Sequence, residues 1–460
     1  LRHALPRGCR PIKVQRRVPI RRQDRGAICP AVRSMTTLTR ADESIAVQAL
    51  RVGMFVRLDG GWMSHPFPLN NFKIVSAQQI ETIRSLGVDK VCWDPSLSDP
   101  EPAAGALQTT PPGAPVAALE AAPSREAEAG HVIPSRDQCL AEQRAALVEC
   151  ERQFNEVAAA CRQATGRIAS DPEQAKQAVE SVTSALLNKI LVEEDLCVRL
   201  LRDSAGSIAS THALNVSILS LLLGRKFGLS PTELQELGNG ALLHDIGKIG
   251  MTERLHHPDE YFTPIETRAY EEHVAFGLER GRQMGLSAGV MQIIAQHHEM
   301  ADASGFPGKL GSERMSDASR IVAMVNAFDT LCNPQVAKRA VTPHEALAQM
   351  FTQAKKRFDT TLLSVFIKLI GVYPAGSTVQ LTDDRLAVVV SVNSARPLKP
   401  RVLVHDAKVP REEALVIDIG EHAGLGIRRS VRPQQLPVPA LHYLAPRQRV
   451  AYYFEPVVTV

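Results

Sequence analysis

The sequence of 460 residues is poor in aromatic side chains, which make up 5% of it, so a strand-rich fold is not expected to dominate. It has no run of about 20 apolar residues, the length that spans a bilayer, and its first segment lacks the apolar core of a signal peptide. The eight cysteines form no Cys-x-x-Cys pair, which argues against a disulfide framework or a zinc knuckle. We therefore expect a mostly helical, cytoplasmic protein without a membrane span.

The net charge of +4 is distributed unevenly along the chain. Residues 1–34 hold ten Lys and Arg against one acid, Asp24, a net of +9 that leaves −5 for residues 35–460. Because an acidic body has no broad electrostatic surface for nucleic acid, we expect no nucleic-acid polymer among the partners. Residues 1–43 are predicted to form a basic, disordered head, with an arm that binds acidic surfaces as the alternative.

The next part of the chain divides into three segments of different composition. Residues 44–97 alternate apolar and polar side chains from Val47 to Val56 and then predict a helix at 76–86, which together indicate a small α/β domain. Residues 98–134 are rich in Ala, Pro and Glu and predict a disordered linker. Residues 135–202 keep a helical apolar period and predict a connector of two long helices, which could relay a signal or only pack beside the next domain.

Residues 203–372 contain three helix-start signals, each a capping box with proline at the first helical position. These are Ser230-Pro-Thr-Glu233, Thr263-Pro-Ile-Glu266 and Thr342-Pro-His-Glu345. We expect His212 to begin one helix, and His244 to close the next with Gly247 as its terminator. His273 is expected about two turns into a third helix, and His297 at the end of a fourth.

From residue 373 onward the pattern changes to strand-like alternation, for example at Val379 and Leu381 and again at Leu386 and Val388. Residues 373–460 are therefore predicted to form a small β-rich C-terminal module. The fold class that follows is mainly α, with an all-α helical domain flanked by a small N-terminal α/β domain and this module.

Seven of the 14 histidines fall between residues 212 and 298. They include the pair His244-Asp245, in the run His-Asp-Ile-Gly-Lys, and the pair His297-His298. A histidine next to an aspartate can bring a nitrogen and a carboxylate oxygen to one point in space, which suits a metal site. With His212 and His273, the two pairs make a set of candidate ligands on several helices.

Five histidines and one carboxylate suit Fe, Mn or Zn better than Ca, which prefers oxygen ligands. In a dinuclear site Asp245 could bridge two ions, which activate water and hold phosphoryl oxygens, while Lys248 meets the phosphate as a point charge. A single buried histidine more often bonds a backbone carbonyl than a metal. We assign that structural role to His256, His257, His344, His405, His422 and His442.

Three motifs in this region are Ala-Leu-Leu-His-Asp-Ile-Gly-Lys-Ile-Gly at 241–250, His297-His-Glu299 and Asp302-Ala-Ser-Gly-Phe-Pro307. Together they resemble the HD-GYP family, bacterial phosphodiesterases of cyclic di-GMP, over residues 205–370, and imply an HD-type helical domain. Residues 44–97, with Leu50-Arg-Val-Gly-Met-Phe-Val56 and His65-Pro-Phe67, resemble the small domain commonly found ahead of HD-GYP domains.

The resemblance implies that the metal ligands are His212, His244, Asp245, His273, His297 and His298. It implies divalent transition-metal ions, with Fe or Mn favoured. We expect two ions and not three, because the glutamate that recruits a third ion in some members is Ile208 here. The family's last metal-binding aspartate corresponds to Asn326, whose carboxamide can coordinate but holds an ion less well. Asp329 lies on the same helix face and is an alternative ligand, although the family has a separate aspartate there.

The signature loop departs from the family's Asp-Gly-x-Gly-Tyr-Pro, because it reads Asp302-Ala303-Ser-Gly-Phe306-Pro. Phe306 can stack on a guanine or pack in the core but lacks the tyrosine hydroxyl, and Ala303 lacks the backbone freedom of glycine. The family's downstream basic pair appears as Gln335 and Lys338. The substrate contacts implied by the resemblance are Asp302, Phe306, Arg320 and Lys338, with Asp245 and Lys248 as catalytic residues.

The predicted function is hydrolysis of cyclic di-GMP to linear pGpG, GMP or both, with activity reduced by Asn326 and the altered loop. The alternative is a catalytically weak or inactive cyclic di-GMP sensor that scaffolds signalling proteins through the flanking domains. A plain HD nucleotidase is a third reading, but it would need neither the second histidine pair nor the Gly-Phe-Pro loop. The oligomeric state is left open.

Overall fold

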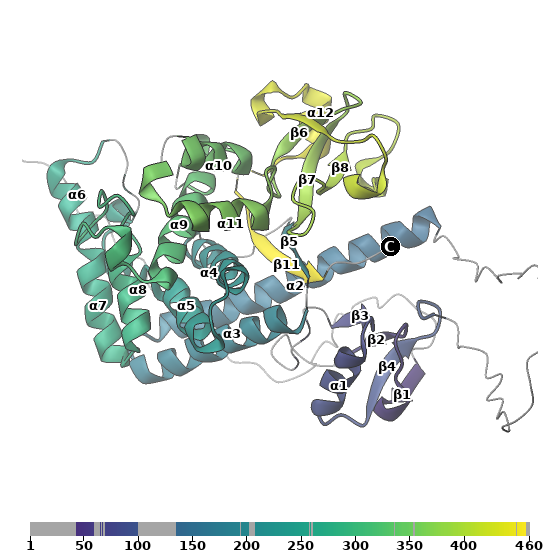
Figure 1. The fold of residues 1–460 in the computed structure, drawn as a ribbon, viewed down its shortest axis with the longest axis horizontal. Coiled ribbons are helices and arrows are strands. Elements are labelled where there is room, and N and C mark those ends of the chain that lie inside the picture. Colours follow the sequence, from purple (N-terminus) through teal and green to yellow (C-terminus); the bar gives the residue numbers. More distant parts are fainter. Residues whose placement is uncertain are drawn as a thin grey trace, which may run out of the picture. The chain divides into compact units, whose positions relative to one another are not determined.

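The computed structural model describes residues 43–58, 65, 67, 70–99, 135–193, 195–201, 208–256, 258, 261–334, 336–352, 355–447 and 449–456. The head predicted for 1–43 and the linker predicted for 98–134 lie almost wholly outside these residues. Figure 1 shows the elements in chain order, from the small purple sheet to the yellow C-terminal strands. None of the helices in the described part of the chain has the length and apolar character that a bilayer span requires.

The N-terminal domain is a four-stranded antiparallel sheet in the order β1-β4-β2-β3, with one helix. Its elements are β1 (Glu43–Ala46), β2 (Phe55–Arg57), β3 (Asn71–Lys73), α1 (Ala77–Ser85) and β4 (Lys90–Asp94). The helix predicted at 76–86 is confirmed, and the Ser76 side chain caps it by accepting a hydrogen bond from the backbone N–H of Gln79.

The alternating stretch from Val47 to Val56 is not one strand, which corrects the prediction. A 3-10 turn, η1 (Val47–Ala49), interrupts it, and Gly53 follows in a left-handed conformation with φ +92°. Val47 and Val56, at the two ends of this stretch, are buried in the core of this domain, whereas Val52 between them is 48% exposed. The ends of the stretch are therefore buried as the apolar pattern predicts, but the turns at η1 and Gly53 interrupt the alternation.

The two predicted connector helices are present as α2 (Arg136–Gly166) and α3 (Pro172–Val192), capped at their N-termini by Ser135 and Asp171. Near its end α3 carries a lysine, Lys189, with no exposed surface. The Lys189 ammonium donates hydrogen bonds to the backbone oxygens of His65, at 3.1 Å, and Phe67. The connector therefore contacts the N-terminal domain through the buried amine of Lys189.

The central domain is all-α, as predicted, and its core gathers around α4, which packs against α5, α9 and α11. All three predicted capping boxes are confirmed, at Ser230, Thr263 and Thr342. The helices are α4 (Ile208–Phe227), α5 (Pro231–Leu243), α6 (Pro264–Glu271), α7 (His273–Met284), α8 (Ala288–Gln296), α9 (Asp317–Cys332), α10 (Pro343–Thr352) and α11 (Thr360–Ile370). The 3-10 turns are η2 (Ile246–Lys248), η3 (Glu253–Leu255), η4 (Ser312–Arg314), η5 (Ala337–Arg339) and η6 (Lys355–Arg357).

Two expectations about this domain are wrong in detail. The third helix is broken after Glu271, so His273 stands at the N-terminus of α7 and not two turns into a helix. Gly247 does not terminate α5, which ends at Leu243, but lies in η2. A Cβ at Gly247 would stand 1.8 Å from the backbone oxygen of His273, so glycine is needed there for close packing.

The C-terminal sheet has seven strands, of which five follow the order β10-β6-β7-β5-β11, while β8 pairs with β7 and β9. The elements are β6 (Thr378–Leu381), β7 (Leu386–Asn393), β8 (Arg401–Val404), η7 (Arg411–Glu413), β9 (Val416–Asp418), η8 (Ile419–Glu421), β10 (Ile427–Ser430), η9 (Pro433–Gln435), α12 (Val438–Leu444) and β11 (Tyr452–Pro456). The strand β5 (Leu196–Leu200) comes from the segment predicted as helical connector, which corrects that prediction. It lies between β7 and β11, and its residues 196–199 are buried, with Arg199 in a buried ion pair with Glu455 of β11.

Candidate metal centre

Helix ends from the central domain bring the predicted histidines and Asp245 together. His212 lies on α4, His244 and Asp245 follow α5, His273 begins α7, and His297 and His298 follow α8. They form two groups whose possible ligand atoms lie within 4.8 Å of one another. One group is His212, His244 and Asp245, and the other is Asp245, His273, His297 and His298. Asp245 is the member that the two groups share.

The carboxylate of Asp245 presents one oxygen to each group. Its Oδ2 lies 3.8 Å from Nε2 of His212 and 3.4 Å from Nε2 of His244. Its Oδ1 lies 3.7 Å from Nε2 of His273 and 3.7 Å from Nε2 of His297. The Nε2 atoms of His212 and His244 are 3.3 Å apart, and those of His273 and His297 are 3.2 Å apart. This spacing suits two nitrogens that each bind the same ion at about 2.1 Å.

Backbone carbonyls orient three of these rings. Nδ1 faces the backbone oxygen three residues earlier, at 2.8 Å for His244 and Ala241, 2.5 Å for His273 and Tyr270, and 2.8 Å for His297 and Ile294. Because a carbonyl oxygen can only accept, Nδ1 carries the proton and Nε2 keeps its lone pair. The Nε2 lone pair of each ring is then free on the side of Asp245. Metal-binding histidines have the same arrangement, in which one ring nitrogen donates to a carbonyl and the other binds the metal.

The fourth ring, His212, is oriented by a carboxylate. Its Nδ1 lies 2.6 Å from Oδ2 of Asp329, which is fully buried. Asp329 Oδ1 also accepts hydrogen bonds from the side-chain amides of Asn215, at 2.7 Å, and Asn333, at 2.8 Å. Asp329 was an alternative ligand in the sequence analysis, but here it supports a ligand from behind.

The surroundings of the site favour the protonation states in which aspartate and histidine bind a metal, a charged carboxylate and a neutral imidazole. Burial lowers the pKa of His273 to about 3 and lowers the pKa values of His297 and His298 as well. Burial alone would raise the pKa of Asp245, but the ammonium of Lys248, 2.8 Å from Oδ2, and His244 hold it well below its ordinary range. The charged carboxylate of Asp245 therefore faces neutral imidazoles at His273, His297 and His298, and metal binding requires those forms.

The residues present fit a divalent metal. Oδ1 of Asp245 is buried and, among the described residues, has no hydrogen-bond partner. A buried carboxylate oxygen without a partner is costly, and a cation held by His273 and His297 would satisfy it. Imidazole and carboxylate donors suit Fe, Mn or Zn and disfavour Ca.

Asn326, the predicted seventh ligand, lies on α9 and is 5% exposed. Its Oδ1 accepts a hydrogen bond of 3.4 Å from the hydroxyl of Thr330, one turn later. That long bond leaves the carboxamide available, so its role as a ligand stays a prediction.

The loop after α8 is anchored by Glu299, which belongs to the His-His-Glu motif but received no role from the sequence. Its buried carboxylate accepts hydrogen bonds from the backbone N–H groups of Gly308, at 2.5 Å, and Leu310, at 2.8 Å. A Cβ at Gly305 would stand 2.3 Å from the backbone oxygen of His298. The loop is thus held tightly against the histidine pair.

Within this loop Phe306 stacks on the ring of His298, with centroids 4.5 Å apart and planes at 21°. Asp302 is exposed, and its Oδ1 accepts a hydrogen bond of 3.1 Å from the backbone N–H of Ser304. Ala303 has a left-handed backbone with φ 60°, so alanine here occupies a conformation that glycine favours. Phe306 lies at the metal group, whereas Asp302 faces solvent.

The two predicted basic substrate contacts differ in their surroundings. Arg320 forms ion pairs with Asp359, at 2.7 Å, and Asp317, so its guanidinium already has two carboxylate partners. Lys338 is exposed on η5. As substrate contacts both stay predictions, and Arg320 would have to exchange a carboxylate for a phosphate.

Tyr270, on α6, is a residue of the site that the sequence analysis did not identify. It is 7% exposed, and its hydroxyl lies 3.1 Å from Nε2 of His298. The ammonium of Lys248 stands 5.3 Å from the centre of its ring. The one available signal was a tyrosine three residues before a candidate ligand, which is too common a pattern to use.

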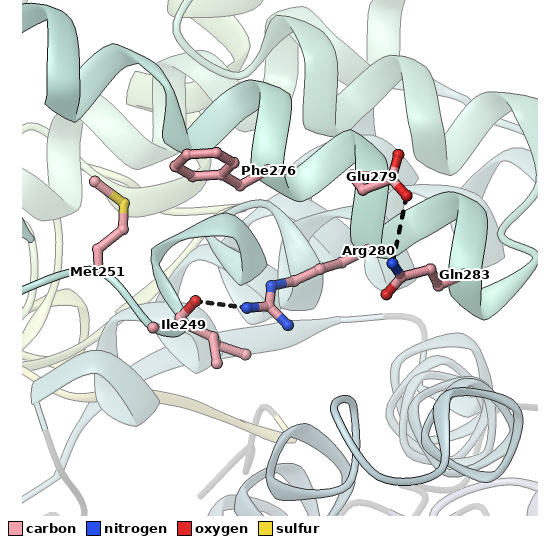
Figure 2. Close-up of a pocket in the computed structure, with 7 residues that line it drawn as sticks. Ile249, Met251, Phe276, Glu279, Arg280 and Gln283 are labelled. Carbon is pink, nitrogen blue, oxygen red and sulfur yellow. Dashed lines mark hydrogen bonds between the residues drawn. The ribbon is translucent and has the colours of Figure 1, made fainter.

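A surface pocket of about 360 Å³ lies beside the turn that follows Lys248 (Figure 2). Its walls include Ile249, Met251, Phe276 and Arg280, and the Arg280 guanidinium donates a hydrogen bond of 2.7 Å to the backbone oxygen of Ile249. Neither Asp245 nor the metal-site histidines line this pocket, so it is separate from the metal centre.

Sequence profiles of two domains match the chain. An HD domain matches residues 195–362, and a domain of unknown function, DUF3391, matches residues 43–179. This confirms the two resemblances in their expected order. The DUF3391 match extends beyond the small domain predicted at 44–97, through α2 and into the first turns of α3.

Three relatives are similar to parts of the chain. A cyclic di-GMP phosphodiesterase of Pseudomonas aeruginosa is 29% identical over 387 residues, 82% of this chain and 88% of the relative. A cyclic di-GMP phosphodiesterase of Borreliella burgdorferi is 24% identical over 49% of this chain and 60% of the relative. A 3'3'-cGAMP-specific phosphodiesterase of Vibrio cholerae is 25% identical over 34% of this chain and 30% of the relative.

Proposed function

This chain carries an HD domain behind a DUF3391 domain, and we propose that it is a metal-dependent phosphodiesterase that hydrolyses cyclic di-GMP to linear pGpG, GMP or both. The Pseudomonas relative named for this activity matches most of both chains. We further propose that the site takes two divalent ions, Fe or Mn, and that the enzyme serves second-messenger signalling with protein partners.

The observation that carries the proposal is the position of Asp245 between two histidine groups. Each carboxylate oxygen faces a different pair of Nε2 atoms, and the oxygen facing His273 and His297 has no hydrogen-bond partner among the described residues. A histidine with only a structural role in the core would need no partner other than a backbone carbonyl. Here the carbonyls take Nδ1 and leave Nε2 free, which supports a bridged pair of ions.

Two ions in such a site supply an activated water and a clamp for phosphoryl oxygens. The water oxygen bonds to phosphorus, the bond from phosphorus to a ribose 3' oxygen breaks, and that oxygen takes up a proton. The chain's own residues position the reactants. The Asp245 carboxylate would hold the ions. The Lys248 ammonium, 2.8 Å from Asp245, would attract the negatively charged scissile phosphate.

Metal analysis combined with a hydrolysis assay on the full chain tests this proposal. We expect the wild type to hold close to two equivalents of Mn or Fe and to cleave cyclic di-GMP, with 3'3'-cGAMP as the competing substrate. His244→Ala should lose metal and activity. His422→Ala is the matched control, because His422 is exposed and lies outside both ligand groups. A metal-loaded wild type that leaves both dinucleotides intact would overturn the proposed enzyme.

The second candidate is a sensor that binds cyclic di-GMP without cleaving it. Two observations favour it: Asn326 carries no charge where an aspartate would hold an ion, and Arg320 is already engaged by two carboxylates. Calorimetric titration of metal-free protein with cyclic di-GMP separates the two candidates. A sensor binds without metal, whereas an enzyme that holds phosphate through its ions does not.

A further inference from the structure

One tyrosine contacts two histidines of the same ligand group. The backbone oxygen of Tyr270 accepts a hydrogen bond of 2.5 Å from Nδ1 of His273. Its hydroxyl lies 3.1 Å from Nε2 of His298. Both histidines belong to the group around Oδ1 of Asp245, so a single buried residue on α6 supports two of its three rings.

His298 is the exception among the five histidines of the site. The other four have Nδ1 against a carbonyl or carboxylate, whereas the hydrogen bond of His298 is on Nε2. Within the described part of the chain, its Nδ1 has no hydrogen-bond partner. Stacking on Phe306 fixes the plane of the ring but not which edge faces the site, because a half-turn of the ring leaves the stack unchanged.

We propose that Tyr270 is a positioning residue for His298. The Tyr270 hydroxyl forms a hydrogen bond with Nε2 of His298, and this leaves Nδ1 of His298 as the nitrogen available to the ion beside His273 and His297. This inference rests on the proposed dinuclear site. The hydroxyl is the group that distinguishes the two edges of the ring, since Phe306 offers none. For Nδ1 to keep the lone pair that holds an ion, Nε2 carries the ring proton and donates it to the phenol oxygen of Tyr270.

Tyr270→Phe in the full-length chain tests the proposal, because it removes the hydroxyl and keeps the ring and the backbone bond to His273. Stepwise Co²⁺ titration followed by visible absorption reports the two ions without any substrate. We expect one of the two ions to bind about 10- to 100-fold more weakly, with a changed absorption band, and the other to be unaffected. Tyr261→Phe is the matched control, since Tyr261 is 72% exposed and precedes the same helix.

His298→Ala and the double variant show whether the effect passes through His298. If it does, Tyr270→Phe weakens binding no further once His298 is absent. Equal affinity for both ions in Tyr270→Phe and wild type overturns the proposal, and so does an additive loss in the double variant. A wild type that takes up no ion overturns the proposed function itself, and the inference with it. Melting of each metal-free variant identifies any that is unfolded, and Tyr270→Trp, which also lacks the hydroxyl, then replaces Tyr270→Phe.

Discussion

Nδ1 of His212 lies 2.6 Å from Oδ2 of Asp329, although the two residues are 117 positions apart in the chain. Burial opposes protonation of His212, but the hydrogen bond and charge of Asp329 raise its pKa. Nδ1 is therefore a firm donor, and the opposite nitrogen is turned to His244 and Asp245. A carboxylate behind a ligand histidine fixes the ring and increases its basicity.

Asp329→Asn should lower the affinity of the ion beside His212 and His244 by about 10- to 100-fold, since the amide keeps the shape but loses the charge. Competition between the protein and a chelator measures this affinity. Asp137→Asn is the control, because Asp137 is exposed in the first turn of α2. If Asp329→Asn binds both ions like the wild type, Asp329 has no part in supporting His212.

Asn326→Asp should raise metal occupancy or turnover, because a carboxylate adds the charge that the carboxamide lacks. The position is buried on α9, and the Thr330 hydroxyl can donate to either side chain. Metal content after dialysis and the hydrolysis rate are the two measurements. An unchanged value of both would mean that residue 326 is not a ligand in this chain.

Ala303→Gly should stabilise the protein by about 1 kcal/mol, because a left-handed backbone costs an L-residue roughly 1–2 kcal/mol that glycine avoids. Urea unfolding measures the difference. Ala348→Gly is a control of opposite sign, since Ala348 is exposed inside α10 and glycine there should destabilise by about 1 kcal/mol. Destabilisation by Ala303→Gly would show that the loop does not hold this strain.

Lys189 should make stability depend on pH. Burial lowers its pKa from 10.5 to about 7, so between these values the unfolded chain binds more protons than the native one. The free energy of unfolding should then rise from pH 7 toward pH 10, by at most about 1.4 kcal/mol per pH unit. Below pH 7 both states are protonated and the contribution is constant.

Lys189→Met removes this titration, so urea unfolding of the variant at pH 7, 8 and 9 should show a smaller rise than the wild type. The oxygens of His65 and Phe67 lose their donor in the variant at every pH, which shifts the curve without changing its slope. Parallel curves would contradict a lowered pKa for Lys189.

Much of the site could be predicted because its ligands stand in short motifs. The pairs His244-Asp245 and His297-His298 lie at helix ends; a capping box at Ser230 located the first of these helices, and its apolar residues located the second. What supports the ligands could not be predicted, because it comes from distant positions. Asp329 looked like a spare ligand, and Tyr270 like an ordinary helix residue, until the fold brought each to a histidine.

The fold shows the same limit. Apolar periodicity located the helices of the connector and the central domain, but it did not identify β5, whose five residues are too few to show a period. That strand is determined by its neighbours β7 and β11, which lie far away in the sequence. Arg320 is similar, because nothing local shows that Asp359 will neutralise it.

The side chain of Asn215 connects the metal centre to β11. Its amide donates to Asp329 and to the backbone oxygen of Val450, and its oxygen accepts a hydrogen bond of 2.9 Å from the backbone N–H of Tyr452. During synthesis the ribosome releases this strand after every ligand has emerged. The support of His212 is therefore completed only when β11 docks, so a fragment that ends at residue 372 should keep the ligands but assemble a loose, weakly metallated site.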